Sequence, residues 1–212
     1  AKMKQEKFHF SEDDVKPYFN IDSVLIKGVF YAAQRAYGLT FKRAWDVPTY
    51  HKDMRVYEVI DKDGKPLALW YCDYFRRPTK RGGAWMSSFA KQSKYRKQQP
   101  IIYNVCNYAK APEAQPTLLT WDEVTTMFHE FGHALHGILS DCEYNSLSGT
   151  AVARDFVEMP SQFNESFASI PEIFNHYARH TETGAPMPEE LKEKMLSSIN
   201  FQPAYALGEN LG

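Results

Sequence analysis

The segment that most constrains the fold is a helix predicted over residues 120–139, because it carries two histidines four residues apart. Its centre reads His129-Glu130-Phe131-Gly132-His133. Histidines at this spacing lie on one helix face, one turn apart, so both imidazoles can reach a single metal ion. Glu130 lies beside that site, where it can take a proton from water. A catalytic zinc has three protein ligands and an open fourth position, so a third ligand must come from further along the chain.

The residues around the motif favour a real helix. Thr120-Trp121-Asp122-Glu123 has the capping-box pattern that marks a helix start. After it, apolar residues recur at steps of three or four, and His129 and His133 flank this stripe. The stripe consists of Val124, Met127, Phe128, Phe131, Leu135 and Ile138. We therefore expect the two histidines at the edge of a cleft.

The third ligand is not fixed by spacing. Glu143, Glu158 and Glu165 all follow the motif, the first in a predicted loop and the others on a predicted helix at about 155–170. His136, one turn beyond His133, could supply a third imidazole. A structural zinc site would favour cysteines paired at short spacing, and no cysteines are placed in that way. The pattern therefore predicts a catalytic rather than a structural zinc.

Composition limits the partners and the location. The chain has 25 basic and 26 acidic residues and a net charge of −1, which argues against a nucleic-acid partner. No apolar run approaches the ~20 residues that a membrane span needs, so we expect no membrane partner. Three widely spaced cysteines do not form a disulfide framework, which favours a reducing compartment and a cytoplasmic location.

The predicted elements give an α+β chain that is mostly helical. A helix is expected at 22–37, a hairpin from strands 54–60 and 67–75, and a further strand at 101–108. More helices are expected at 172–180 and 188–198. Residues 1–48 form a helical lead-in, 49–110 a small sheet, and 111–212 a helical part that binds zinc. A sheet followed by helices is typical of the α+β class.

Several segments together resemble the thimet oligopeptidase family of zinc metallopeptidases, and the resemblance covers nearly the whole chain. Besides the histidine helix, they are Tyr103-Asn104-Val105-Cys106-Asn107-Tyr108, Leu147-Ser148-Gly149-Thr150 and Arg154-Asp155-Phe156-Val157-Glu158-Met159-Pro160-Ser161-Gln162. The resemblance implies one Zn²⁺ ion held by His129, His133 and Glu158, with Glu130 as general base and His136 unligated. It also implies a zincin-like catalytic fragment in which a small β-sheet precedes the zinc-binding helix.

The resemblance implies a zinc-dependent peptidase that releases dipeptides from the free C-terminus of short peptides. One alternative is an oligopeptidase that cuts internally in short peptides. Another is a fragment that binds zinc but is catalytically incompetent. Family members are longer, with helical regions on both sides of this segment. The Tyr and His residues with which they stabilise the reaction intermediate lie beyond the equivalent of Gly212, so we expect a central fragment of the catalytic domain.

Several other residues can be interpreted either as part of the site or as part of the fold. Gln162 could orient a ligand histidine by accepting its free N–H, or could serve only in helix packing. Asn107 and its strand neighbours could offer backbone groups to a peptide at a sheet edge, or could form an ordinary buried strand. Gly149 could allow close backbone approach or merely turn the chain. Candidates for reading a terminal carboxylate are Arg76, Arg77, Lys80, Arg81 and Arg154, although such charges usually form a solvated face.

Overall fold

Five strands form one sheet in the order β1-β2-β3-β5-β4 in the computed structural model, which describes residues 11–199. Strands β3 and β5 are parallel, and every other neighbouring pair is antiparallel. Strand β4 is therefore the edge of the sheet on one side and β1 the edge on the other. The strands are β1 Thr40–Arg43, β2 Arg55–Ile60, β3 Pro66–Phe75, β4 Trp85–Ala90 and β5 Ile101–Tyr108.

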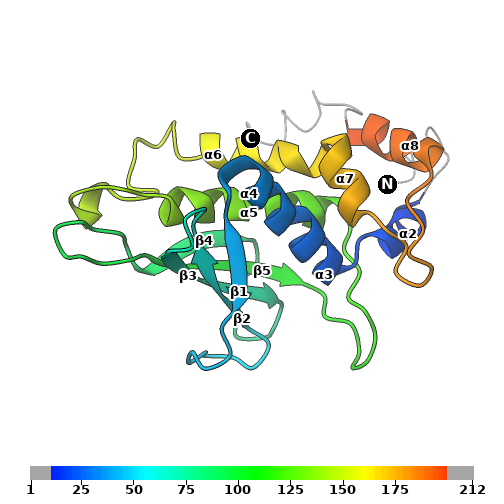
Figure 1. Ribbon diagram of the computed structural model, residues 1–212. Coiled ribbons are helices and arrows are strands. Elements are labelled where there is room, and N and C mark those ends of the chain that lie inside the picture. Colours follow the sequence, from blue (N-terminus) through cyan, green and yellow to red (C-terminus); the bar gives the residue numbers. More distant parts are fainter. Residues whose placement is uncertain (1–10, 200–212) are drawn as a thin grey trace, which may run out of the picture.

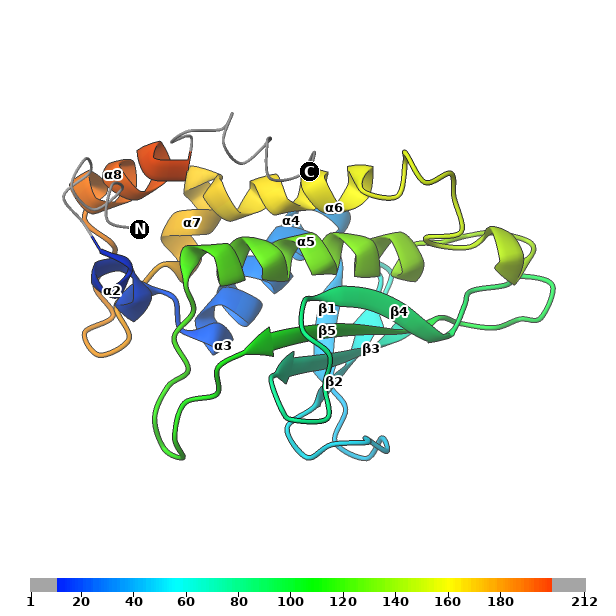
Figure 2. The same ribbon diagram turned by 180° about the vertical axis from the view of Figure 1, so that it is seen from behind.

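The helices lie together on one side of the sheet (Figure 1). Helix α5 crosses the sheet face, and α6 lies on the far side of α5 from the sheet in both views (Figure 2). A π-helical stretch, Val24–Phe30, joins α3 to α4 without a break. The α-helices are α2 Glu12–Val15, α3 Ile21–Ser23, α4 Tyr31–Tyr37, α5 Trp121–Ile138, α6 Met159–Glu165, α7 Pro171–Tyr177 and α8 Glu189–Ile199.

The main core lies between the sheet and the helices. Alternate residues of β3 and β5 point to α5, as the two-residue period of a strand requires. Trp70 and Ile102 from the strands pack in one buried cluster with Phe128 and Phe131 from α5. The opposite sheet face carries a smaller buried cluster of Met54, Val56 and Tyr71. Burial of α5 against the sheet therefore fixes the helix that carries the histidines.

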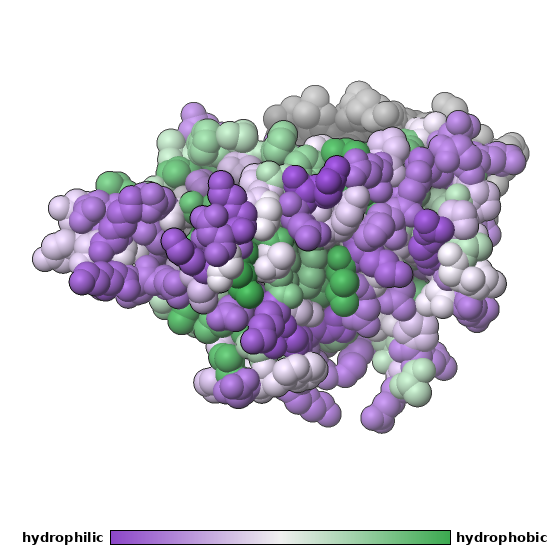
Figure 3. All heavy atoms as spheres, viewed as in Figure 1, coloured by the Kyte–Doolittle hydropathy of each residue, from purple (hydrophilic) through white to green (hydrophobic). Residues whose placement is uncertain are grey.

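The surface is mostly hydrophilic in the view of Figure 3, with hydrophobic side chains gathered over α6. Met159 and Phe163 of α6 are each about half exposed. None of the described helices combines the length and the apolar character that crossing a membrane requires.

The α+β class is confirmed, and helices hold more of the described residues than strands do. The predicted strands at 54–60, 67–75 and 101–108 match β2, β3 and β5 within one residue. Strand β1 lies inside the predicted helical lead-in, so the sheet begins before the expected boundary at residue 49. Strand β4 has no counterpart among the strands that the sequence predicts. The predicted helix at 155–170 begins later, at Met159, and ends as a 3₁₀ turn, Ser166–Ser169.

Candidate metal centre

Helix α5 starts where the capping box predicts. The Glu123 backbone N–H donates to the Thr120 hydroxyl over 3.1 Å, and the Thr120 N–H donates to the Glu123 carboxylate over 2.9 Å. These bonds satisfy two of the N–H groups that a helix start leaves unpaired. The predicted apolar stripe is buried along its whole length. The helix register that places His129 and His133 is thus fixed at its start and along its face.

Three predicted zinc ligands meet at one point. Glu158 Oε2 lies 3.2 Å from His129 Nε2 and 3.1 Å from His133 Nε2. The three donor atoms lie within 4.8 Å of one another. Two imidazole nitrogens and one carboxylate oxygen form a donor set that suits a catalytic zinc ion. The chemistry and the convergence of these donors therefore fit a single ion.

A close contact between α5 and α6 brings Glu158 to the histidines. Gly132 makes this contact possible, because a Cβ atom there would lie 2.6 Å from Ser161 Cα and 2.7 Å from the Pro160 carbonyl oxygen. The Asn164 side-chain amide also donates to the Phe128 carbonyl over 2.6 Å. Glu158 precedes the first residue of α6. The position of the carboxylate therefore depends on how closely these two helices pack.

The imidazole of His129 is held from its other side by Glu165, whose Oε2 lies 3.1 Å from His129 Nδ1. A proton on Nδ1 then points to the carboxylate, and Nε2 is left as the donor for a metal. From the sequence, Gln162 was a candidate either for this orienting role or for helix packing alone. Gln162 is exposed and makes no side-chain hydrogen bond within residues 11–199, so Glu165 occupies that place.

Glu130 is buried beside the three donors. Its Oε2 has no hydrogen-bond partner among the described residues, and neither has Nδ1 of His133. Burial raises the pKa of Glu130 to about 7, while His129 lowers it and Glu158 raises it by smaller amounts. A buried carboxyl without a partner is unusual in a stable core and is typical of a reactive position. Glu130 can therefore both hold and release a proton near neutral pH.

The surroundings favour the forms of these side chains that bind metal. A hydrogen bond from Ser161, 2.8 Å long, lowers the pKa of Glu158 and keeps it ionised. Burial lowers the pKa of His133 and keeps its imidazole neutral. The bond to Glu165 raises the pKa of His129. Metal ligands must give up their protons on binding, and the first two shifts reduce that cost.

A cleft runs past the site along the start of β4. One cavity of about 490 Å³ is lined by Asn107, Glu165 and residues of α5, and a second of about 420 Å³ is lined by Thr150 and Glu158. Both cavities share Ala84, His129 and Glu130. The metal centre therefore lies at the middle of an open groove.

The sheet edge at this groove is β4, whereas the strand of Asn107 lies between β3 and β4. The Asn107 amide donates to the carbonyls of Arg81 and Gly83, each over 2.7 Å. Gly149 has a positive φ of 62°, and a Cβ there would lie 3.2 Å from Gly137 Cα. Gly149 therefore turns the chain at a point where its backbone lies close to α5.

Two of the five basic candidates are engaged elsewhere. Arg77 and Lys80 form ion pairs with Asp73. Arg76, Arg81 and Arg154 form no ion pair within residues 11–199. His136 is not among the three residues whose donor atoms converge.

The chain matches the model of a family described as Peptidase family M3 over residues 1–211. Dipeptidyl carboxypeptidases of Salmonella typhimurium and Escherichia coli are each 49% identical to it, over 99% of this chain and 31% of the relative. Oligopeptidase A of Escherichia coli is 39% identical over 96% of this chain and 30% of the relative. The chain thus spans about 31% of the length of these dipeptidyl carboxypeptidases.

Proposed function

The chain belongs to peptidase family M3, and on this basis we propose that it carries the zinc centre of a peptidase that releases dipeptides from free C-termini. The observation that supports this most is the meeting of His129, His133 and Glu158 at one point. The proposed fold is zincin-like, with His129 and His133 on the helix over the sheet. Short peptides are the proposed substrates, and a cytoplasmic location stays a prediction.

The proposed chemistry divides between the ion and the side chains. A zinc ion held by His129, His133 and Glu158 would polarise the scissile carbonyl and make water a stronger acid. Glu130 takes the proton of the attacking water on its buried carboxylate and passes it to the leaving amine. Glu165 keeps His129 in the orientation and tautomer that direct Nε2 at the ion.

The edge of the sheet offers a place where an extended peptide substrate can bind. An extended peptide can add to the free edge of β4 through backbone hydrogen bonds, as peptides do at exposed sheet edges. The groove passes Ala84 and then Glu130, so a peptide lying along β4 would bring one of its carbonyls to the metal centre. Burial of Glu130 keeps its proton transfer away from bulk water.

Two alternative functions each lack one requirement of dipeptide release. Internal cleavage of short peptides needs no group that reads a terminal carboxylate, and oligopeptidase A bears that name among the relatives. The higher identity to dipeptidyl carboxypeptidases, 49% against 39%, favours dipeptide release. A zinc-binding but inactive chain needs only the three ligands.

Hydrolysis of one peptide in two forms separates these functions. The zinc-loaded enzyme is given a peptide with a free C-terminus and the same peptide as its amide. Dipeptide release predicts a loss of more than ~10-fold in kcat/KM for the amide, the scale of a lost charge-assisted contact. Equal rates would favour internal cleavage, and turnover by residues 1–212 alone would exclude the inactive chain.

A further inference from the structure

The parallel pair β3 and β5 contains an irregularity close to the metal groove. Asp73 pairs with Val105, but the next paired residues are Phe75 and Tyr108, so β5 has one residue more than β3 in this interval. Such a bulge bends its strand and redirects the side chain that follows. Here the residues in the bulge are Cys106 and Asn107.

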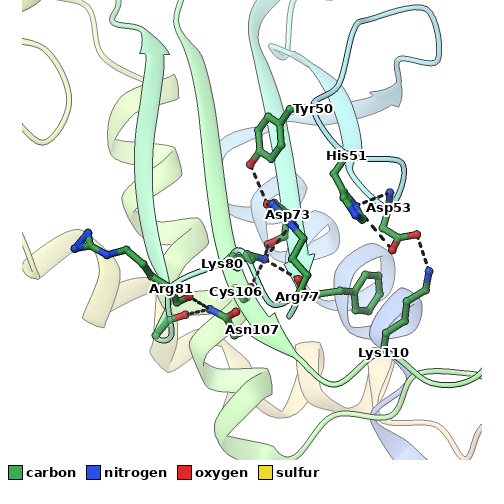
Figure 4. A network of polar contacts seen from close by, with 12 residues as sticks. Tyr50, His51, Asp53, Asp73, Arg77, Lys80, Arg81, Cys106, Asn107 and Lys110 are labelled. Carbon is green, nitrogen blue, oxygen red and sulfur yellow. Dashed lines mark hydrogen bonds and ion pairs between the residues drawn. The ribbon is translucent and has the colours of Figure 1, made fainter.

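The ammonium group of Lys80 binds both strands at this bulge. Lys80 Nζ donates to the carbonyls of Asp73 and Phe75 on β3, each over 2.8 Å, and to the carbonyl of Cys106 on β5. It also lies 3.0 Å from Asp73 Oδ1. Figure 4 shows this convergence of contacts on the lysine. The Lys80 side chain is only 4% exposed, so these contacts replace water almost completely.

The buried lysine is balanced by Asp73, which is itself fully engaged. Arg77 donates to both Asp73 carboxylate oxygens over 2.8 Å, and the Tyr50 hydroxyl donates to it over 2.9 Å. Burying a charge is expensive unless it is paired and hydrogen-bonded, and both conditions are met here. Arg77 and Lys80, two candidates for binding a substrate carboxylate, thus bind the carboxylate of Asp73.

A short path leads from Lys80 to the groove. Asn107 follows Cys106, and its side-chain amide holds the carbonyls of Arg81 and Gly83 (Figure 4). The next residue, Ala84, lines both cavities together with Glu130. The bulge, its lysine and the amide therefore form one chain of contacts that ends at the start of β4.

We propose that Lys80 is a positioning residue whose ammonium closes the bulge between β3 and β5 and thereby fixes the start of β4 beside the metal centre. The role follows from contacts on the sheet face opposite the helices, far from any metal ligand in the sequence. It rests on the proposed function in one respect only, namely that a substrate uses the edge of β4.

Hydrogen exchange of the zinc-loaded protein tests the contact chain without any need for activity. Lys80→Met removes the ammonium and keeps a side chain of similar length. Exchange in peptides that cover residues 81–88 should rise about 5- to 10-fold, the scale of one or two lost hydrogen bonds. Exchange in α5 and the affinity for zinc should stay unchanged. Lys110→Met is the matched control, since Lys110 pairs with Asp53 and is half exposed.

Two further variants keep the test decisive. If Lys80→Met does not fold, Lys80→Gln replaces it. The Gln amide keeps N–H donors that can bind some of the three carbonyls that Lys80 contacts. Asn107→Ala removes only the hydrogen bonds to the carbonyls of Arg81 and Gly83 and leaves no buried charge. It should produce the same rise in exchange over residues 81–88. Unchanged exchange over 81–88 in a folded Lys80 variant, or a rise spread equally over α5, would overturn the proposal.

Peptidase kinetics add a second readout. KM for a peptide should rise about 5- to 10-fold in the Lys80 variant, again the scale of one or two hydrogen bonds, while zinc content is unchanged. A general loss of stability would lower the amount of active enzyme and leave KM unchanged. A failure to hydrolyse peptides would bear on the proposed function alone, because the exchange measurement tests Lys80 without any activity.

Discussion

Three glutamates surround the histidines, and their neighbours give each a different role. Glu158 lies between the two imidazoles, and Glu165 binds the far nitrogen of His129. Glu130 is buried, and its Oε2 has no hydrogen-bond partner within residues 11–199. A carboxylate that already accepts hydrogen bonds is a poor proton acceptor. A carboxylate whose pKa is raised by burial is a good one. This contrast supports the proposal that Glu130 is the general base.

Glu130→Gln tests that assignment. The amide keeps the size of the side chain but cannot take a proton, so kcat of the zinc enzyme should fall by ~10²-fold or more. Zinc content should be unchanged, because Glu130 is not one of the three converging donors. Steady-state kinetics together with metal analysis check both points. Activity within a few-fold of the unmodified enzyme would rule out this role.

Glu165→Ala separates the two candidates for orienting His129. Loss of a carboxylate that orients a ligand histidine typically lowers metal affinity 10- to 100-fold. Gln162→Ala is the control, since that side chain is exposed, and it should leave the affinity unchanged. Competition with a chelator measures both affinities. A larger loss of metal affinity in Gln162→Ala than in Glu165→Ala would show that Gln162 orients His129.

The sequence predicts that His129 and His133 lie on one face of a helix with Glu130 between them, because all three lie on one helix of fixed period. The third ligand lies across a loop, where no period applies, and only the family resemblance selects Glu158. The choice between Gln162 and Glu165 depends on the rotation of α6. Ser161 and Glu165 take the side of that helix that meets α5, and Gln162 is turned away.

At the scale of elements, the packing of α5 on α6 controls the site. Gly132→Ala places a methyl group against backbone atoms of Ser161 and Pro160, which cannot move without shifting α6. We expect a loss of about 1–3 kcal/mol in the free energy of unfolding, as for overpacked cores. Zinc affinity should fall as well, because Glu158 moves with α6. Urea unfolding and chelator competition measure the two effects.

Gly137→Ala is the matched control on the same helix. Its new methyl group would meet the ends of the Ile102 and Met86 side chains, 2.7 and 2.8 Å away, and these can rotate. Both variants gain the same helix propensity, so only the contact differs. An equal loss of stability and zinc affinity in the two variants would contradict the account.

The two edge strands show what the sequence leaves open. Strand β4 contains the pair Ser87-Ser88 and is only partly buried, so its apolar alternation is weak. Strand β1 has four residues that alternate between exposed and partly buried positions. Edge strands are stabilised by their single neighbour rather than by their own pattern. Strands β2, β3 and β5, which have two neighbours each, were all predicted.

At the scale of the whole molecule, the buried charges on the second sheet face make stability depend on pH. Burial alone would raise the pKa of Asp73, but hydrogen bonds from Arg77, Lys80 and Tyr50 outweigh it and lower the pKa below its ordinary value. A lowered folded-state pKa stabilises the protein above pH ~4, the unfolded value, and this contribution is lost as the pH falls through the folded value.

Asp73→Asn should therefore be costly at pH 7 and less so in acid. Leaving Lys80 buried without its carboxylate should cost about 3–5 kcal/mol at pH 7. The difference from the unmodified protein should narrow near pH 3, as measured by urea unfolding at both pH values. Asp141→Asn, which removes an exposed carboxylate paired with Lys94, should change stability little at either pH. If the difference in free energy of unfolding between the two proteins were the same at both pH values, the ionised Asp73 would not be its cause.

Every role proposed for these residues depends on one zinc ion held by His129, His133 and Glu158 where α5 meets the start of α6. Anomalous diffraction at the zinc edge, on crystals of the zinc-loaded protein, tests it most directly. We expect one peak per chain within bonding distance of Nε2 of both histidines and of the Glu158 carboxylate. A peak bound by another carboxylate, such as Glu143 or Glu165, with Glu158 turned away from the histidines, would contradict it.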